Sequence, residues 1–219
     1  MPIRAAIFDL DGVLVDTAKY HYLAWCRLAR ELGFAFTEKD NERLKGVSRM
    51  RSLEILLETG GMAGRFTPEQ MHGMAERKNG WYVEYITHMD ASEILPGAAE
   101  CLRAFRALGV KTALGSASKN SGLILDNLQL RDLFDTIVDG TRTSRAKPDP
   151  EVFVLGARDL GVDPAECVVF EDAQAGLEAA RAGGMKAVAV GKPEDLSGYD
   201  AIVAGLFEVD PAALMRRLG

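Results

Sequence analysis

Short apolar runs alternate along most of the chain with longer segments of helical periodicity. Each run is continuous rather than alternating, which predicts a strand buried on both faces. The runs lie at 5–8, 110–115, 136–138, 167–170, 187–190 and 201–203. Predicted helices separate the later runs, at 97–108, 120–128, 150–160, 173–182 and 211–218. The expected fold class is therefore α/β, with a Rossmann-like parallel sheet that helices cover on both faces.

The interval from 16 to 92 breaks this alternation, because it contains no convincing strand. Its apolar residues recur at helical spacing, as at Leu28 and Leu32. The helices predicted from this spacing lie at 17–32, 48–58 and 68–89. We therefore expect an all-helical cap domain at 16–92, inserted into an α/β core domain that comprises 1–15 and 93–219.

Composition narrows the function class without deciding it. The chain has 219 residues and a formal net charge of −6, which argues against a broad nucleic-acid surface but leaves room for a local phosphate site. No apolar segment approaches the length of a membrane span, and the N-terminal apolar run is too short for a signal peptide. The cysteines are widely spaced and match no zinc or disulfide pattern; they are Cys26, Cys101 and Cys167. We expect a cytoplasmic protein with reduced, buried thiols, no nucleic-acid partner and no membrane partner.

Charged and hydroxyl residues follow four of the predicted strands. Ligands of open α/β sheets bind beyond the carboxyl ends of the strands, so these residues are expected to share one edge. They are Asp9 and Asp11 after the first strand, 116–120 after the second, Lys147 beyond the third, and Glu171 and Asp172 after the fourth.

This set of residue types suits phosphate chemistry. Clustered carboxylates repel one another without a cation, and oxygen ligands favour a hard ion, usually Mg²⁺ where phosphate also binds. Lys147 adds a positive charge, and Ser116 with the amides after it can hold phosphate oxygens. Asp9 and Asp11 are two apart, so their side chains point the same way while the chain stays extended. One carboxylate can then attack phosphorus while the other handles a proton.

Four quoted stretches carry a resemblance to a known family. FDLDGVLVDT, GSAS, AKPDP and FEDAQAG, in this order, resemble the four motifs of the haloacid dehalogenase superfamily of phosphotransferases. A lone DxD motif is weak evidence, whereas four motifs in order at strand ends are specific. In the helical interval, YHYLAW, NERLKGVSRMRSL and ERKN, together with SASKN in the core, resemble the sugar-phosphate mutases of that superfamily. The resemblance covers the full chain and is weakest after Gly198.

The resemblance implies a role for each matching residue. Asp9 is the nucleophile that becomes an aspartyl phosphate, and Asp11 is the general acid/base. Mg²⁺ is held by the Asp9 side chain, the Asp11 carbonyl and Asp172, with Glu171 in or beside the ligand shell. The residues implied to hold the transferring phosphoryl group are Ser116, Ala117 and Lys147, and those implied to hold the non-reacting phosphate are Arg49, Ser118 and Asn120. Thr17 is implied at the hinge, and the residues near the sugar or involved in cap closure are His21, Trp25, Lys45, Gly46, Val47, Ser52 and Lys78.

The implied function is a Mg²⁺-dependent phosphomutase that acts on small sugar phosphates as a monomer. It would move a phosphoryl group between the C1 and C6 oxygens of glucose through a 1,6-bisphosphate, while the cap excludes water. A sugar-phosphate phosphatase of the same superfamily is the main alternative, because its first step is identical. Arg49, Ser118 and Asn120 favour the mutase, since a phosphatase has no second phosphate to hold.

Simpler interpretations remain open at this point. A catalytically dead binding module would carry substitutions at Asp9, Lys147 or Asp172, and all three are intact. His21 fits a surface histidine packed on Trp25, and most charges on small helices form a solvated face, which would account for the basic residues of the cap. Acidic residues at 171–172 also suit the start of a helix.

Overall fold

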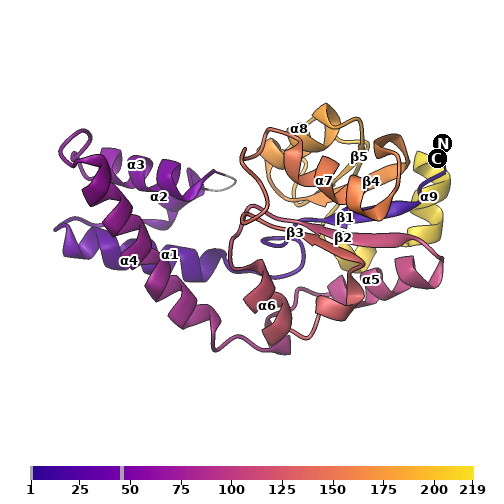
Figure 1. The fold of residues 1–219 in the computed structure, drawn as a ribbon, viewed down its shortest axis with the longest axis horizontal. Helices are drawn as coiled ribbons and strands as arrows, with labels where there is room; N and C mark the ends of the chain where they lie inside the picture. Colours follow the sequence, from indigo (N-terminus) through magenta and orange to yellow (C-terminus); the bar gives the residue numbers. More distant parts are fainter. Residues whose placement is uncertain (1, 45–46) are drawn as a thin grey trace. The chain divides into compact units, whose positions relative to one another are not determined.

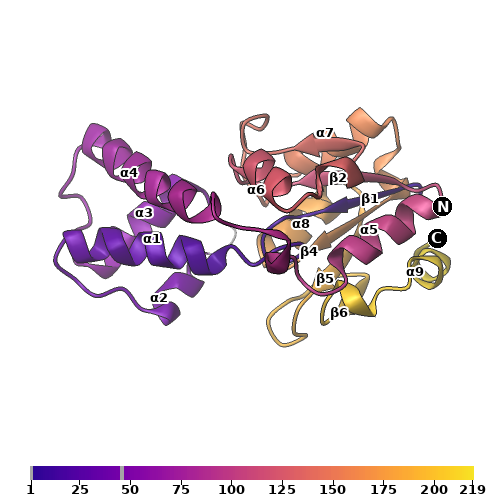
Figure 2. The ribbon, with the colours of Figure 1, turned by 90° about the horizontal axis from the view of Figure 1, so that it is seen from below.

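The computed structural model describes residues 2–44 and 47–219, which form two compact units. One is a helical unit, Thr17–His88. The other, the core unit, combines the chain up to Asp16 with Met89–Gly219. Figures 1 and 2 show the elements of each unit. Within the described residues, no helix combines the length and apolar character needed to cross a membrane.

The described part of the core unit contains a six-stranded sheet in the order β3-β2-β1-β4-β5-β6, with every neighbouring pair parallel. The strands are β1 (Ala5–Phe8), β2 (Lys111–Gly115), β3 (Thr136–Val138), β4 (Cys167–Glu171), β5 (Lys186–Val190) and β6 (Ala201–Val203). The core helices are α5 (Ala98–Ala107), α6 (Ser121–Asn127), α7 (Glu151–Leu160), α8 (Gln174–Ala182) and α9 (Pro211–Leu218). Single turns of 3-10 helix are η1 (Ala91–Glu93), η2 (Arg131–Leu133), η3 (Pro164–Glu166) and η4 (Leu206–Glu208). The predicted parallel α/β core is confirmed.

Helices cover the sheet on both faces, which explains the unbroken apolar runs. On one face, which α7 and α8 cover (Figure 1), Ile7 packs in a buried cluster with Phe153 of α7 and Leu177 of α8. On the other face the ring of Phe8 stacks on Phe170 at a centroid distance of 4.7 Å, and both rings meet Phe105 of α5 edge-on. Each such buried side chain contributes about 1.5–3 kcal/mol to the free energy of folding.

The register of the sheet determines which residues lie side by side at its carboxyl edge. Phe8 of β1 is paired with Phe170 of β4 on one side and with Leu114 of β2 on the other. The residues that follow, Asp9 and Glu171, therefore lie side by side at the same edge, and the Asp9 amide donates to the Phe170 carbonyl at 3.0 Å.

The helical unit has a hydrophobic core of its own. Trp25, Leu28, Leu53, Leu56 and Met74 are among its buried members. Its helices are α1 (Ala18–Glu31), α2 (Glu38–Glu42), α3 (Arg49–Thr59) and α4 (Pro68–Ile86). The described part of this unit contains no strand, as the sequence predicts. The short helix α2 was not predicted, because it buries no residue and so has no apolar stripe.

The start of α4 follows from capping chemistry. The Thr67 hydroxyl accepts from the Gln70 amide, and the Gln70 side chain accepts from the Thr67 amide, with Pro68 in the first turn. The helix continues through Gly73 and Gly80, although glycine is unfavourable inside a helix.

The two core segments that flank the helical unit are joined to each other. Val15 and Ile94 form an antiparallel bridge, and the Leu95 amide donates to the Leu14 carbonyl at 2.9 Å. The chain therefore leaves the core and returns to it at neighbouring points.

The cysteines are free thiols, and two of the three are buried as expected. Cys101 and Cys167 lie in the core unit with their thiol pKa raised by burial to about 12. Cys26 is only half-buried, because it packs against the outside of the buried cluster of the helical unit, where its thiol donates to the Phe36 carbonyl at 3.4 Å. The expectation that all three are buried was wrong for Cys26.

Candidate active site

Three carboxylates gather at the carboxyl edge of β1 and β4. Asp9, Glu171 and Asp172 each offer one oxygen, and these oxygens lie within 4.8 Å of one another. Asp9 and Glu171 are buried, and Asp172 is half-buried. Asp11 lies in the turn after β1, where its backbone forms a bridge with Val15, and its carboxylate is not part of this group.

Lys147 bridges two of these carboxylates. Its Nζ lies 2.6 Å from Oδ1 of Asp9 and 2.7 Å from Oε2 of Glu171. The Lys147, Asp9 and Glu171 side chains are 4%, 9% and 2% exposed, respectively, so the ion pairs are shielded from water. The ring of Phe153 lies beneath the ammonium group, with its centroid 4.7 Å from Nζ. An aromatic face at this distance favours the charged form of the lysine.

Electrostatics within the cluster keep Lys147 charged and disfavour the ionisation of Glu171. Burial by itself lowers the pKa of Lys147, but the Asp9 and Glu171 carboxylates more than offset this, so its pKa is raised. Burial raises the pKa of Glu171 to about 8; the Lys147 ammonium opposes this shift, and the Asp9 and Asp172 carboxylates add to it. An added cation would relieve the repulsion among the carboxylates.

The donor set fits a divalent metal ion of the kind that the fold family implies. When ionised, three carboxylates against one ammonium leave an excess of two negative charges. The ligand atoms are all oxygen, which suits a hard cation rather than a thiophilic one.

Two glycines make room for these carboxylates. A Cβ on Gly12, whose φ is +77°, would lie 2.0 Å from Oδ2 of Asp172. A Cβ on Gly176 of α8 would lie 2.0 Å from Cδ of Glu171. Real Cβ atoms do not approach other atoms this closely, so both positions need glycine for the carboxylates to stay in place. Gly176 was not among the predicted site residues. The sequence feature that could have identified it is a glycine inside a predicted helix, where glycine is unfavourable.

Hydroxyl groups shape the loop after β2. The Oγ of buried Ser116 accepts from the Ser118 amide at 3.1 Å, and the Oγ of Ser118 accepts from the Asn120 amide at 3.2 Å. Each of these hydroxyls can also donate one hydrogen bond through its O–H group. The intervening Ala117 is exposed. The loop therefore places backbone and hydroxyl groups of the predicted phosphate-binding residues in one compact turn.

Glu151 fixes the loop that carries Lys147, although it was not among the predicted site residues. Its carboxylate accepts from the amides of Arg145 at 2.6 Å and Ser144 at 2.9 Å. Hydrogen bonds from these groups hold the pKa of Glu151 below its usual value. The available signal was an acidic residue in the first turn of a predicted helix, directly after AKPDP.

In the helical unit, α1 and α4 bring His21 and Lys78 together. Nζ of Lys78 lies 2.7 Å from Nδ1 of His21, and the His21 ring stacks on Tyr82 at a centroid distance of 3.9 Å. Burial, Lys78 and Arg49 together hold the pKa of His21 well below its usual value. A neutral His21 can accept a hydrogen bond from the ammonium at Nδ1.

The simpler interpretations of these residues fit poorly. The stacking partner of His21 is Tyr82. Trp25 instead faces Lys78, whose Nζ lies 4.5 Å from its ring centroid. Lys78 is only 2% exposed, so it does not belong to a solvated charged face.

Arg49, at the start of α3, contacts α4. Its Nη1 donates to Oε1 of Glu76 at 2.7 Å, and its Nη2 donates to Oδ1 of Asn79 at 2.9 Å. Ser52, three residues further along α3, is buried. Glu76 and Asn79 lie within ERKN, one of the stretches that carry the family resemblance, but the resemblance implies no role for either residue.

The remaining predicted residues are divided between the two units. Thr17 is the N-cap residue of α1, and Val47 lies before α3 with 36% of its surface exposed. Lys45 and Gly46 lie outside the described residues. The predicted ligands of the non-reacting phosphate are Arg49 in the helical unit and Ser118 and Asn120 in the core unit.

Comparison with known proteins places the chain in a family. The sequence model of the haloacid dehalogenase-like hydrolases matches residues 3–184. The chain is 41% identical to a β-phosphoglucomutase of Bacillus subtilis, over 92% of this chain and 89% of the relative. The crystal structure of a β-phosphoglucomutase from Clostridium difficile superposes with a TM-score of 0.93 at 40% identity, covering 99% of this chain and 97% of the other. A phosphorylated carbohydrates phosphatase of Thermotoga maritima is 32% identical, over 85% of this chain and 84% of the relative. The chain belongs to the haloacid dehalogenase-like hydrolase family.

Proposed function

We propose that the chain interconverts β-D-glucose 1-phosphate and D-glucose 6-phosphate, as an isomerase that transfers a phosphoryl group within the sugar. The observation that carries this proposal is the buried Asp9–Lys147–Glu171 arrangement at the carboxyl edge of the sheet. It supports phosphoryl transfer, and the likeness to two β-phosphoglucomutases over nearly the whole chain supports the choice of substrate.

In the proposed mechanism, Asp9 receives and returns the phosphoryl group. A carboxylate oxygen of Asp9 attacks phosphorus, the bond from phosphorus to the sugar oxygen breaks, and Asp11 gives its proton to that oxygen. In the return step, Asp11 takes the proton from a sugar hydroxyl as that hydroxyl attacks the aspartyl phosphate. Transfer to the 6-hydroxyl of glucose 1-phosphate forms the 1,6-bisphosphate, which turns around before the 1-phosphate is transferred back to Asp9.

The surrounding groups stabilise charge on the transferring phosphoryl group. Lys147, already held against Asp9, offers its ammonium, and the Ser116 hydroxyl and the Ala117 amide offer donors. We propose that the metal ion is Mg²⁺, held by Asp9, Asp172 and the Asp11 carbonyl with Glu171 in or beside the shell. When bound, Mg²⁺ would neutralise phosphoryl oxygens.

The other proposed roles concern the sugar and its second phosphate. Arg49, Ser118 and Asn120 bind the non-reacting phosphate, which a planar guanidinium suits well. The residues proposed to contact the sugar or to support the helical unit as a cap are Thr17, His21, Trp25, Lys45, Gly46, Val47, Ser52 and Lys78. In this proposal the core domain is catalytic, and the protein acts as a cytoplasmic monomer without nucleic-acid or membrane partners.

A sugar-phosphate phosphatase is the second candidate, supported by the 32% identity to the Thermotoga maritima phosphatase. Phosphorus NMR separates the two functions. With β-glucose 1-phosphate, a trace of the 1,6-bisphosphate and Mg²⁺, the mutase forms glucose 6-phosphate with little free phosphate. Stoichiometric release of inorganic phosphate without glucose 6-phosphate would establish the phosphatase instead.

A further inference from the structure

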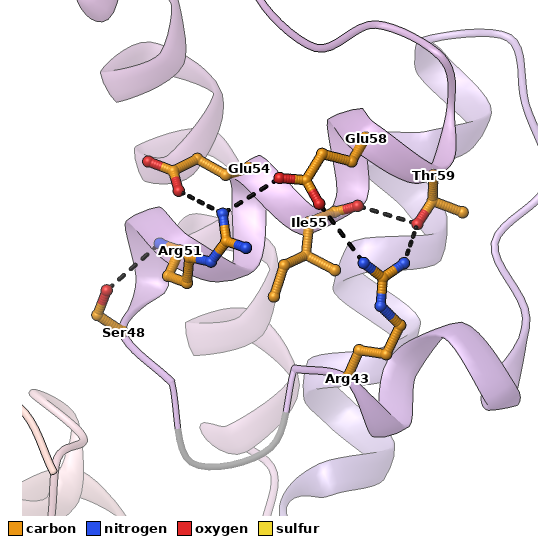
Figure 3. A network of polar contacts seen from close by, with 7 residues as sticks. All are labelled: Arg43, Ser48, Arg51, Glu54, Ile55, Glu58 and Thr59. Atoms are coloured by element: carbon orange, nitrogen blue, oxygen red, sulfur yellow. Dashed lines mark hydrogen bonds and ion pairs between the residues drawn. The ribbon is translucent and has the colours of Figure 1, made fainter. Parts of the chain in front are cut away.

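Arg49 and Arg51, both in the first turn of α3, have different kinds of partner. Arg51 pairs within α3, with Glu54 at 2.8 Å and Glu58 at 3.2 Å (Figure 3). Arg43 joins Glu58 from the end of α2 at 3.5 Å (Figure 3). The Arg51, Glu54 and Glu58 side chains are 49%, 46% and 40% exposed, as is usual for surface ion pairs of small energetic value.

Arg49 differs, because its partners lie on another helix. Glu76 and Asn79 are three residues apart on α4 and so lie on the same face of that helix. One accepts from Nη1 and the other from Nη2, which fixes the plane of the guanidinium at both terminal nitrogens. The Arg49 side chain is 28% exposed, less than that of Arg51. These contacts use two of the five donors of the guanidinium.

We propose that Glu76 and Asn79 are positioning residues that hold the Arg49 guanidinium ready for the non-reacting phosphate of the substrate. This inference rests on the proposed function, in which Arg49 binds that phosphate. A free arginine side chain loses rotamer freedom when it binds an anion, and a side chain that is already held loses less. The donors that α4 does not use remain for the phosphate oxygens. The second phosphate is thus recognised by α3 and α4 together.

A competing interpretation makes the opposite prediction. If Glu76 acted mainly as a negative charge beside Arg49, its removal would strengthen phosphate binding. If it acted through geometry, its removal would weaken binding, and a neutral acceptor at the same place would restore it. Glu76→Ala and Glu76→Gln therefore separate geometry from charge, and Asn79→Ala tests the second contact.

The experiment measures KM and kcat for β-glucose 1-phosphate in the mutase reaction. Glu76→Ala and Asn79→Ala are expected to raise KM by about 3- to 10-fold with a smaller change in kcat, since a mispositioned donor weakens substrate binding. Glu76→Gln is expected to restore KM, because its amide oxygen can accept the same bond from Nη1. Glu54→Ala is the matched control, since it removes a glutamate that contacts Arg51 at a similar distance, and its KM should equal that of the wild type.

A double-mutant cycle tests whether Glu76 acts through Arg49. Arg49→Ala should raise KM by itself, and the addition of Glu76→Ala should raise it no further. Additive effects, a lowered KM in Glu76→Ala, or an unchanged KM in both Glu76→Ala and Asn79→Ala would each overturn the inference. If Glu76→Ala does not fold in a thermal melt, Asn79→Ala with Arg49→Ala gives the same cycle.

Failure of the proposed function would give a different experimental result from failure of this inference. If the wild type forms no glucose 6-phosphate, the proposed function itself is wrong. If the wild type is a mutase but Arg49→Ala leaves KM unchanged, the assignment of Arg49 to the second phosphate is wrong, and the inference about Glu76 and Asn79 is overturned with it.

Discussion

The Nζ atom of Lys147 lies 2.6 Å from Oδ1 of Asp9, and both side chains are almost fully buried. The Lys147 ammonium stabilises the protein here because the Asp9 carboxylate without it would be a buried, uncompensated charge. The pair joins two parts of the chain that are 138 residues apart, one at the end of β1 and one in the loop before α7.

Removal of Lys147 is therefore expected to cost both stability and activity. Lys147→Met leaves Asp9 and Glu171 buried without their cation, so the free energy of unfolding should fall by about 3–5 kcal/mol. Urea denaturation without divalent metal measures this loss. Lys39→Met, at an exposed lysine of α2, is the control and should change stability by less than about 0.5 kcal/mol. An equal urea midpoint for Lys147→Met and the wild type would contradict the structural role.

Substitution of Asp9 is expected to stop phosphoryl transfer while the fold persists. In Asp9→Asn the amide cannot act as the nucleophile, and turnover should fall by about 10³-fold or more. Glu171 still pairs with Lys147 in this variant, so the circular dichroism spectrum should match the wild type. Asp195→Asn, at an exposed carboxylate, serves as the control for turnover. Normal turnover in Asp9→Asn would refute its assignment as the nucleophile.

Gly176 is expected to matter for metal binding rather than for helix formation. Gly176→Ala places a Cβ against the Glu171 carboxyl group, which must shift. Displacement of a group that orients or forms the metal site typically weakens metal binding about 10- to 100-fold. Activity against Mg²⁺ concentration, and calorimetric titration of the protein with Mg²⁺, measure the effect.

A matched control exists on α4. Gly73 is also helical, and in the described part of the chain no atom other than those of its chain neighbours and its own helix backbone lies within 4 Å of the position that a Cβ would take there, so Gly73→Ala should leave the Mg²⁺ dependence unchanged. It should even stabilise the helix, by about 0.5–1 kcal/mol. The same Mg²⁺ dependence in Gly176→Ala and Gly73→Ala would show that the close contact at Glu171 has no bearing on the metal.

The pKa of His21 predicts a loss of stability in mild acid. Burial and the Lys78 and Arg49 charges lower the pKa of His21 from its ordinary value of 6.5. Below about pH 6.5 the unfolded chain takes up a proton that the folded His21 does not, so stability falls as the pH falls. The loss is at most about 1.4 kcal/mol per pH unit for this residue. Thermal melts between pH 7.5 and 5 should show a smaller loss in His21→Gln than in the wild type, and equal losses would contradict this origin.

The fold was largely predictable because its strands are buried on both faces. β1 occupies Ala5–Phe8 and β3 occupies Thr136–Val138, as predicted from continuous apolar runs. β4 extends one residue further than predicted, to Glu171, because the apolar pattern stops at Phe170 while the ladder continues through Glu171 paired with Ala189. A charged side chain ends an apolar run in the sequence but does not end a strand when a buried lysine neutralises it.

The partners of the charged side chains were harder to predict from the sequence than the strands were. Periodicity places Arg49 on a helix, but its partners Glu76 and Asn79 are 27 and 30 residues away and become neighbours only when α3 packs on α4. The same holds for Phe153, an apolar residue of α7 whose ring faces the Lys147 ammonium. Motif order predicts which residue types converge, whereas three-dimensional packing decides which side chain supports which.

The bridge between Val15 and Ile94 has a consequence for protein engineering. The core itself holds the two ends of the inserted helical unit next to each other. A foreign segment whose own termini are equally close to each other could therefore replace residues 17–88 without distorting the sheet. Under the proposed function, in which residues of the insert contact the sugar, chimeras with exchanged inserts would keep the phosphoryl-transfer groups of the core and differ in sugar specificity.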